Sequence, residues 1–274
     1  MFLYGYYQKY FHLPAILHIS IFMLRQLKEF YSVYGYYSLK VWTLHILSLC
    51  SIVYLGLECF VVGIIFFLLV MPLYTLIFHD WVSHEYVQPR NKLSKLFSLF
   101  MFYLQDNTIR GKKNYHVHHH RHWLNQDLDP TYQKLKKLPW YRYVFSLQKP
   151  IAQHIPDIEN SLLESSNLIK TLDKYHRAIY VTLVLVLFCI LPFNWFVTTM
   201  IWYPWLCIIV YNMHDYYFHG PWKGKDKNWL TLIFSTAAWH IAHHESWCKE
   251  YYGPGWWRML NPGWYWRQLL FKTS

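Results

Sequence analysis

Val41–Phe78, which reads VWTLHILSLCSIVYLGLECFVVGIIFFLLVMPLYTLIF, decides the fold because its 38 residues include a single charged side chain, Glu58. A second apolar run, Ala178–Met213, has 36 residues and no charged side chain. A helix needs about 20 apolar residues to cross a bilayer. Each run is therefore long enough for two short spans joined by a tight turn. Gly56–Glu58 and Pro192–Asn194 contain the residue types that favour such turns.

The composition agrees with a membrane protein. Of the 274 residues, 54% are hydrophobic, 21% are aromatic and only 15% are charged, a balance that few soluble domains show. A buried helical core in a soluble protein is the alternative, but buried helices seldom run so far without charge. We therefore predict an all-α integral membrane protein with two transmembrane helical hairpins, about four spans, and a cytoplasmic helical cap.

Basic residues predict the orientation. Lys40 and Arg177 precede the two apolar runs, twelve Lys or Arg residues lie between Arg90 and Lys149, and the proposed turns contain none. By the positive-inside rule, all four span ends lie in the cytoplasm. The net charge of +11 is then mostly a signal of topology, and nucleic acid is excluded as a partner because the basic residues adjoin membrane segments.

The chain is expected to form one membrane-bound domain over residues 1–274. Residues 1–40 are rich in aromatic side chains but carry charges, which favours an interfacial segment. Residues 41–78 and 178–213 form the hairpins, and residues 79–177 and 214–274 form the cytoplasmic regions.

The histidines are clustered. Twelve of the seventeen fall into four short groups: His79 and His84; His116, His118, His119, His120 and His122; His214 and His219; and His240, His243 and His244. Two groups share the spacing HxxHH, which on a helix brings positions i, i+3 and i+4 to one face. Three imidazoles could then ligate a metal from a single helix, and imidazole suits iron, zinc, copper and nickel.

The number of histidines narrows the type of site. Eight or nine plausible ligands exceed what one zinc ion or one haem needs and are enough for two metals. The ExxH pairs of soluble di-iron bundles and the HExxH of zinc proteases are both absent. The pattern therefore predicts a dinuclear histidine site at the cytoplasmic ends of membrane helices. Several neighbouring residues could orient the ligand imidazoles by hydrogen bonds to the ring nitrogen that does not bind the metal. They are Asp80, His118, His122, Asp129, His214 and Glu245.

Three of these motifs resemble the histidine boxes HxxxxH, HxxHH and HxxHH of the membrane fatty-acid desaturase and hydroxylase superfamily. They are His79-Asp-Trp-Val-Ser-His84, His116-Val-His-His119-His120 and His240-Ile-Ala-His243-His244. The order of the motifs and the two hairpins also match, over roughly residues 40 to 250. Some members add an Asn four positions before a further histidine, and this chain has Asp215 before His219 there. That departure leaves open whether Asp215 ligates directly or through water.

The resemblance implies two iron ions, with O2 as co-substrate and a C–H bond of a lipid-like substrate as the site of attack. Desaturation of an acyl chain, carried on a thioester or a lipid, is the leading expectation. Hydroxylation, ketone formation or decarboxylation of an acyl chain, alkane or carotenoid is the alternative outcome on the same scaffold. The implied metal ligands are His79, His84, His116, His119, His120, Asp215, His219, His240, His243 and His244.

The chain contains no dinucleotide fingerprint GxGxxG and no four-cysteine iron–sulfur motif. An external electron donor of ferredoxin or cytochrome b5 type is therefore expected. Lys112, Lys113 and Arg121 beside the second motif could form its docking face, or could contact lipid headgroups. The substrate is expected to reach the site from the membrane lipid.

Two rival classes remain. A histidine-rich metal transporter or sensor would need ionisable residues inside the spans, and the apolar runs hold only His45 and Glu58. A haem-binding electron carrier would leave most of the clustered histidines without a role.

Overall fold

A computed structural model describes residues 39–123, 125, 127–136, 138–146, 155, 157–158, 161–219, 224–234, 238–246 and 252–273. About 79% of the structure is helical, with almost no sheet. The prediction of an all-α fold is therefore confirmed for the described residues. The predicted interfacial segment, apart from its last two residues, lies outside them.

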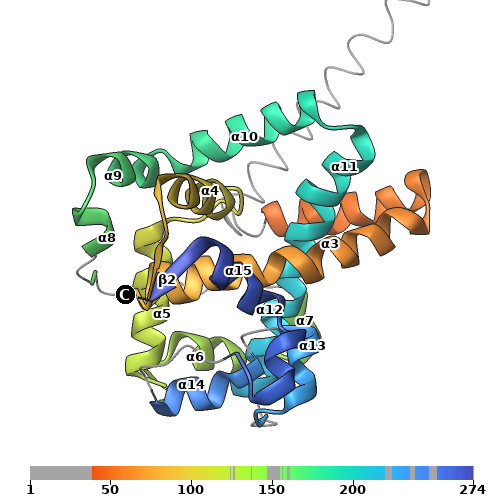
Figure 1. Ribbon diagram of the computed structural model, residues 1–274. Coiled ribbons are helices and arrows are strands. Elements are labelled where there is room, and N and C mark those ends of the chain that lie inside the picture. The colour runs from red at the N-terminus through yellow and green to blue at the C-terminus, as the bar shows by residue number, and fades with distance from the viewer. Residues whose placement is uncertain are drawn as a thin grey trace, which may run out of the picture.

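The elements follow one another as a series of helices with one small sheet (Figure 1). A helix Leu39–Leu55 comes first, and the others are α3 (Leu57–Thr75), η1 (Leu76–Ser83), β1 (Val87–Pro89), α4 (Lys92–Tyr103), α5 (Ile109–Arg121), α6 (Pro130–Lys136), α7 (Trp140–Val144), α8 (Ser161–Glu164), α9 (Asn167–Lys174), α10 (His176–Ile190), α11 (Phe193–Val197), η2 (Thr198–Trp202), α12 (Tyr203–His219), η3 (Asn228–Leu230), α13 (Thr231–Phe234), α14 (His240–Ser246), η5 (Gly255–Leu260), α15 (Pro262–Leu270) and β2 (Phe271–Thr273).

Two continuous helices are long and apolar enough to cross a membrane: Leu57–Ser83 and Phe193–His219, of 27 residues each. Each apolar run is interrupted where a turn was predicted. Gly56, with φ of 78°, separates the helix Leu39–Leu55 from α3, and Pro192 precedes α11. A positive φ is tolerated by glycine because it has no Cβ.

The two long helices touch at Gly63 of α3 and Trp202 of η2. A Cβ built on Gly63 would lie 2.8 Å from the Cβ of Trp202, and both residues are buried. The absence of a side chain at Gly63 therefore permits the close approach of the two backbones, as small residues do between membrane helices.

We expect Gly63→Ala to destabilise the fold, because the added methyl group must push the Trp202 backbone away. The loss should be about 1–3 kcal/mol, as for other overpacked contacts, and thermal unfolding in detergent measures it. Val62→Ala is the matched control, since Val62 is 40% exposed. An unchanged melting temperature for Gly63→Ala would show that the helices are not in contact there.

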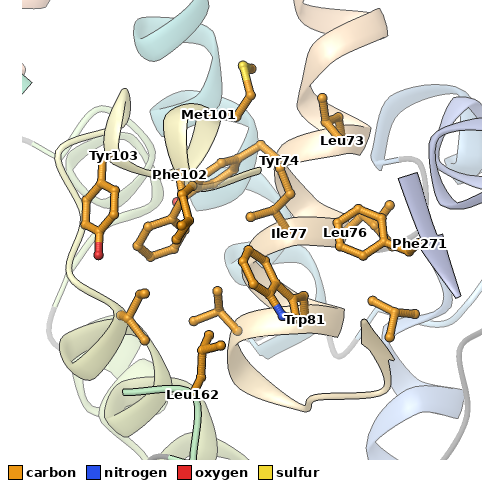
Figure 2. Packing of buried hydrophobic residues seen from close by; sticks show 14 of the residues in the cluster. Leu73, Tyr74, Leu76, Ile77, Trp81, Met101, Phe102, Tyr103, Leu162 and Phe271 are labelled. Carbon is orange, nitrogen blue, oxygen red and sulfur yellow. The ribbon is translucent and has the colours of Figure 1, made fainter. Parts of the chain in front are cut away.

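A core of large side chains fixes the C-terminal end of the first long helix, Leu57–Ser83. Trp81, Ile77 and Phe102 are fully buried, and Figure 2 shows them packed together with Leu76 and Phe271. Ile77 and Trp81 flank His79 on η1. Their packing therefore fixes the orientation of the helix that carries His79.

The C-terminal part of the described chain packs against β1 and against the first long helix. β2 pairs antiparallel with β1, with Val87 opposite Thr273 and Pro89 opposite Phe271. The indole Nε1 of Trp266 in α15 donates to the Leu69 carbonyl of α3 at 2.9 Å. The C-terminal segment therefore supports the helix that carries His79 and the turn that follows His84.

The helices with the remaining histidines lie together. In Figure 1, α6 and α14 occupy the bottom of the view, below α5, whereas α10 crosses the top. α5 contacts both η1 and α6, and α12 also contacts α6. The histidines of η1, α5, α12 and α14 lie close together.

Candidate metal centre

Nine histidines converge in two adjoining groups. The first group contains His79, His84, His116, His120 and His243, and the second contains His119, His219, His240 and His244. Within each group the potential ligand atoms all lie within 4.8 Å of one another. The rings of His120 and His244 stack at 4.1 Å where the groups meet. Nine of the ten predicted metal ligands are thus brought together.

The HxxxxH motif converges because η1 is a π-helix. In an α-helix, residues five apart would lie about 140° apart around the axis. In η1 the backbone bond pattern runs from residue i to residue i+5, and the His84 N–H donates to the His79 carbonyl at 3.0 Å. The two rings consequently lie 4.7 Å apart, centre to centre.

Each HxxHH motif divides its histidines between the groups, which corrects the expectation that one helix supplies three ligands to one metal. On α5, His116 and His120 belong to the first group and His119 to the second. On α14 the division is reversed: His240 and His244 belong to the second group and His243 to the first. Positions i and i+4 point the same way, whereas i+3 and i+4 diverge by about 100°.

Of the cluster His214 and His219, only His219 at the end of α12 belongs to a group. The Asp215 carboxylate lies outside both groups. It accepts a hydrogen bond from the Tyr143 hydroxyl at 3.1 Å and is 3.4 Å from Nδ1 of His214. His214 is buried with its ring 4.5 Å from that of His240. Asp215 and His214 therefore flank the second group.

The nitrogen positions fit metal ions. Nε2 of His243 is 3.2 Å from Nε2 of His84 and 3.1 Å from Nε2 of His120. In the second group, Nε2 of His240 is 2.6 Å from that of His219 and 3.0 Å from that of His244. Metal–imidazole bonds of about 2.0–2.1 Å place neighbouring ligand nitrogens about 3 Å apart. The nitrogens aimed at one another are therefore spaced as ligands of a common ion.

Six of the nine imidazoles are held in their neutral form, which metal binding requires. Burial is the main cause that lowers the pKa of His120 to about 2, and the neighbouring histidines lower it further. Burial followed by neighbouring histidines also places the pKa of His84, His116, His240, His243 and His244 far below the usual range. Nearby histidines lower these pKa values because like charges so close together repel.

Two carboxylates fix the orientation of a ligand in each group. Nδ1 of His79 donates to Asp80 at 2.6 Å, and Nδ1 of His119 donates to Asp129 at 2.8 Å. Asp129 is fully buried, and its Oδ1 also accepts from the Thr131 N–H. Each bond leaves Nε2 of the imidazole for a metal, which is the usual role of a carboxylate behind a histidine ligand.

Three other residues that were predicted to support the ligands, His118, His122 and Glu245, belong to neither histidine group. His118 and His122 contact each other, with ring centres 4.5 Å apart, and neither belongs to a group. Glu245 is exposed on α14.

The three basic candidates for donor docking occupy different surroundings. Lys113 is buried and forms an ion pair with Glu85. Lys112 is half-buried and lines a cavity, with its ammonium over the ring of Phe78. Arg121 is exposed at the end of α5. Arg121 is therefore the most exposed of the three.

The sequence did not reveal three supporting residues. The Tyr252 hydroxyl donates to Oδ2 of Asp80 at 3.2 Å, so it holds the carboxylate that orients His79. Trp123 stacks on His244 at 4.6 Å. Asp226 accepts from the Ile241 N–H at 3.0 Å and from the Ala242 N–H at 2.8 Å. Both oxygens of Asp226 thus cap α14, the helix that supplies both groups.

We expect Asp226→Ala to weaken metal binding in both groups, because α14 loses the cap that fixes His240 and His243. Loss of a helix N-cap costs about 0.5–2 kcal/mol, which corresponds to a reduction of about 2–30-fold in metal affinity. Competition with a chelator measures it. Glu245→Gln removes an exposed carboxylate from the same helix and should leave the affinity unchanged. Equal affinities for the Ala variant and the wild type would show that the cap does not position the ligands.

A cavity of about 680 Å³ adjoins the histidines, which is within the usual size range for small-molecule sites. His79, His116 and His243 of the first group line it, as do His119 and His240 of the second. Its other walls include Tyr74, Phe78, Cys207, Ile208, Tyr211 and Trp239. A molecule in this cavity therefore faces both groups.

Comparison of the chain with protein-family models, with curated proteins and with solved structures finds no match.

Proposed function

We propose that this protein is an integral-membrane di-iron oxidoreductase of the desaturase and hydroxylase type, which uses O2 to attack a C–H bond of a lipid-like substrate. Desaturation of an acyl chain is the leading reaction, and hydroxylation or ketone formation on an acyl chain, alkane or carotenoid is the alternative. The observation that carries this proposal is the position of two all-histidine groups on the wall of one cavity.

The choice of metal rests on the ligand set. Within the described residues, neither group contains a carboxylate or a thiolate. Neutral imidazole suits iron, zinc, copper or nickel, and five plus four nitrogens favour two ions over one. Zinc has no redox chemistry, whereas iron and copper both react with O2 by one-electron steps. We propose iron because the histidine motifs resemble those of the desaturase and hydroxylase superfamily. The surrounding protein buries seven of the nine histidines, and Asp80 and Asp129 orient His79 and His119.

Membrane insertion is supported by an outward-facing apolar surface. No residue of α10 is buried, and its Leu185, Phe188 and Ile190 are more than half exposed. In the helix Leu39–Leu55, Ser48 and Ser51 face inward, whereas Leu49 is 66% exposed. Apolar side chains outside and hydroxyl groups inside suit a lipid environment better than water.

Helix α4 also has hydroxyl side chains inside and apolar side chains outside, which supports contact with the membrane surface. Ser94 and Ser98 are buried there, while Leu93 and Leu96 are 76% and 57% exposed. The apolar face of α4 would lie against the acyl chains in the manner of an interfacial helix.

The proposed topology has four membrane segments with the metal centre on the cytoplasmic side. The helices Leu57–Ser83 and Phe193–His219 cross the bilayer, and each ends with a histidine of the site within or directly after its last turns. The helices Leu39–Leu55 and His176–Ile190 are shorter and would enter the bilayer beside them. The orientation rests on the basic residues at the histidine side of all four segments.

A metal transporter or sensor is less well supported. His45, an ionisable residue within the apolar segments, is engaged on both nitrogens: Trp205 Nε1 donates to its Nδ1 at 2.7 Å, and its Nε2 contacts the Phe145 carbonyl at 2.8 Å. A side chain fixed in this way joins helices and is poorly placed to relay an ion.

Electrons must come from outside the chain, from a carrier of the ferredoxin or cytochrome b5 class. Arg121 is the proposed docking residue, because it is exposed two positions from Trp123, whose ring stacks on His244. An acidic carrier surface would complement this charge.

Product analysis tests the proposed function. Purified protein loaded with Fe(II) should be supplied with a reduced carrier, O2 and candidate lipids, including fatty acids and acyl thioesters. Mass spectrometry should detect loss of two hydrogens or gain of one oxygen, and His240→Ala should abolish either change. If iron-loaded protein consumes neither O2 nor reductant with any lipid, the oxidoreductase assignment is wrong.

A further inference from the structure

The helices η5 and α15 carry an exposed apolar surface. Five of their large apolar side chains are between 44% and 66% exposed: Trp256, Met259, Leu260, Tyr265 and Leu269. The two helices form one unit, because the Tyr265 hydroxyl donates to the Met259 carbonyl at 2.9 Å. Single exposed apolar residues are ordinary, but a group of them on adjoining helices marks a surface that binds an apolar partner. We call these five residues the C-terminal apolar surface.

The position of this surface beside α3 points to lipid as the partner. α15 packs against α3 (Figure 1), and the Trp266 indole donates to the Leu69 carbonyl at 2.9 Å. Leu69 is itself exposed, in the middle of the candidate membrane span Leu57–Ser83. It precedes His79 by ten residues, or about 15 Å along the helix axis. With α3 in the bilayer, α15 therefore lies on the membrane side of the histidines.

The C-terminal apolar surface is also connected to the apolar face of α4. β2, directly after α15, pairs with β1, directly before α4. The Arg90 N–H, between β1 and α4, donates to the Leu270 carbonyl at 2.9 Å. The helix already proposed to lie at the membrane surface is therefore joined to α15 through one small sheet.

The charge of the segment suits negatively charged lipid head groups. Tyr251–Ser274 contains three basic residues and no acidic residue, together with four tryptophans. Arg258 and Lys272 are exposed, and the guanidinium of Arg258 lies 5.1 Å from the centre of the Trp264 ring. Tryptophan is enriched where a membrane meets water, and exposed Lys and Arg residues are attracted to anionic lipids.

We propose that η5 and α15 form a membrane-embedded element that does not cross the bilayer, and that this element binds a leaflet containing anionic phospholipid. The C-terminal apolar surface contacts the acyl chains, while Arg258 and Lys272 contact the head groups, as in other interfacial helices. Because β2 pairs with β1, this contact also ties the turn after His84 to the membrane. The inference rests on the membrane insertion in the proposed function, but on neither the metal nor the reaction.

Photo-cross-linking of the full chain in lipid nanodiscs tests the proposal. p-Benzoylphenylalanine replaces Met259 or Leu269 in separate variants, and on irradiation its ketone reacts with C–H bonds of the molecule beside it. The discs contain equal amounts of phosphatidylcholine and phosphatidylglycerol, and mass spectrometry identifies each adduct. We expect a phospholipid adduct at both positions. No adduct, or a cross-link to a second copy of the chain, would overturn the proposal.

Two further positions separate this inference from the proposed function. Leu185 is exposed within the proposed membrane segment α10 and should form lipid adducts, whereas the exposed Asp127 near the second histidine motif should form none. Adducts at Leu185 but not at Met259 and Leu269 would contradict this inference alone. The absence of adducts at all three would also contradict the proposed membrane insertion. Metal content and O2 consumption test the oxidoreductase independently of either result.

Charge variants test the lipid class. Adducts at the C-terminal apolar surface should contain several-fold more phosphatidylglycerol than phosphatidylcholine. Arg258→Gln combined with Lys272→Gln should abolish this preference while the adducts remain. Arg142→Gln is the matched control, because it neutralises an exposed arginine on α7, and it should keep the preference. Equal amounts of both lipids in the wild-type adducts, or a preference that survives the double change, would contradict the roles of Arg258 and Lys272.

Discussion

Replacing His119 by Ala should reduce the metal content from two ions per chain to one and abolish C–H oxidation. The second group has four histidines, so the variant retains three, and His119 is the member that Asp129 orients. The first group keeps all of its five ligands and should keep its ion. Elemental analysis of the purified variant, with the protein concentration from amino-acid analysis, measures the ratio.

The neighbouring His118 provides the control. It lies on the same helix one position earlier, contacts His122, and is outside both groups. His118→Ala should retain both ions and activity. His243→Ala is informative in another way, because it leaves four histidines in the first group, so both ions should still bind, one of them more weakly. Equal metal loss in His118→Ala and His119→Ala would contradict the division into two groups.

Asp129→Asn should weaken binding of the second ion by about 10–100-fold, as is typical when the carboxylate behind a histidine ligand is lost. The Asn side chain has nearly the same shape, so the change removes the negative charge that strengthens His119 as a ligand. Asp129 is completely buried, and water therefore does not replace the carboxylate. Titration with metal against a chromophoric chelator should resolve one unchanged site and one weakened site.

Asp127→Asn serves as the comparison, because it neutralises an exposed carboxylate two positions away. Its two affinities should equal those of the wild type. If Asp129→Asn also binds both ions normally, the hydrogen bond between Asp129 and His119 is irrelevant to the metal.

The sequence predicted the helical class and the breaks between the apolar helices, because long apolar runs and their Gly and Pro interruptions are local features. It also predicted which histidines gather, since nine of the proposed ligands lie in the two groups. It predicted the geometry of the motifs less well. The HxxHH spacing was interpreted as one ligating face, whereas the angular difference between i+3 and i+4 sends these histidines to different groups.

Other features depend on contacts that no short motif encodes. The convergence of His79 and His84 requires a π-helix, which a periodicity argument based on α-helices does not anticipate. Asp226 caps α14 from a segment 14 residues earlier, and Tyr252 reaches Asp80 from the C-terminal part of the chain. Lys112 was predicted to belong to a docking face or to contact lipid headgroups, and its half-buried side chain also lines the cavity, which the sequence did not indicate.

The most direct test of the central claim is the iron content of the wild-type protein after anaerobic loading with Fe(II) and removal of loosely bound metal. Two histidine groups of five and four ligands predict about two ions per chain, with Mössbauer spectra of the oxidised protein showing an exchange-coupled pair. A single ion per chain, or two ions with no magnetic coupling, would contradict a dinuclear centre built from these nine histidines.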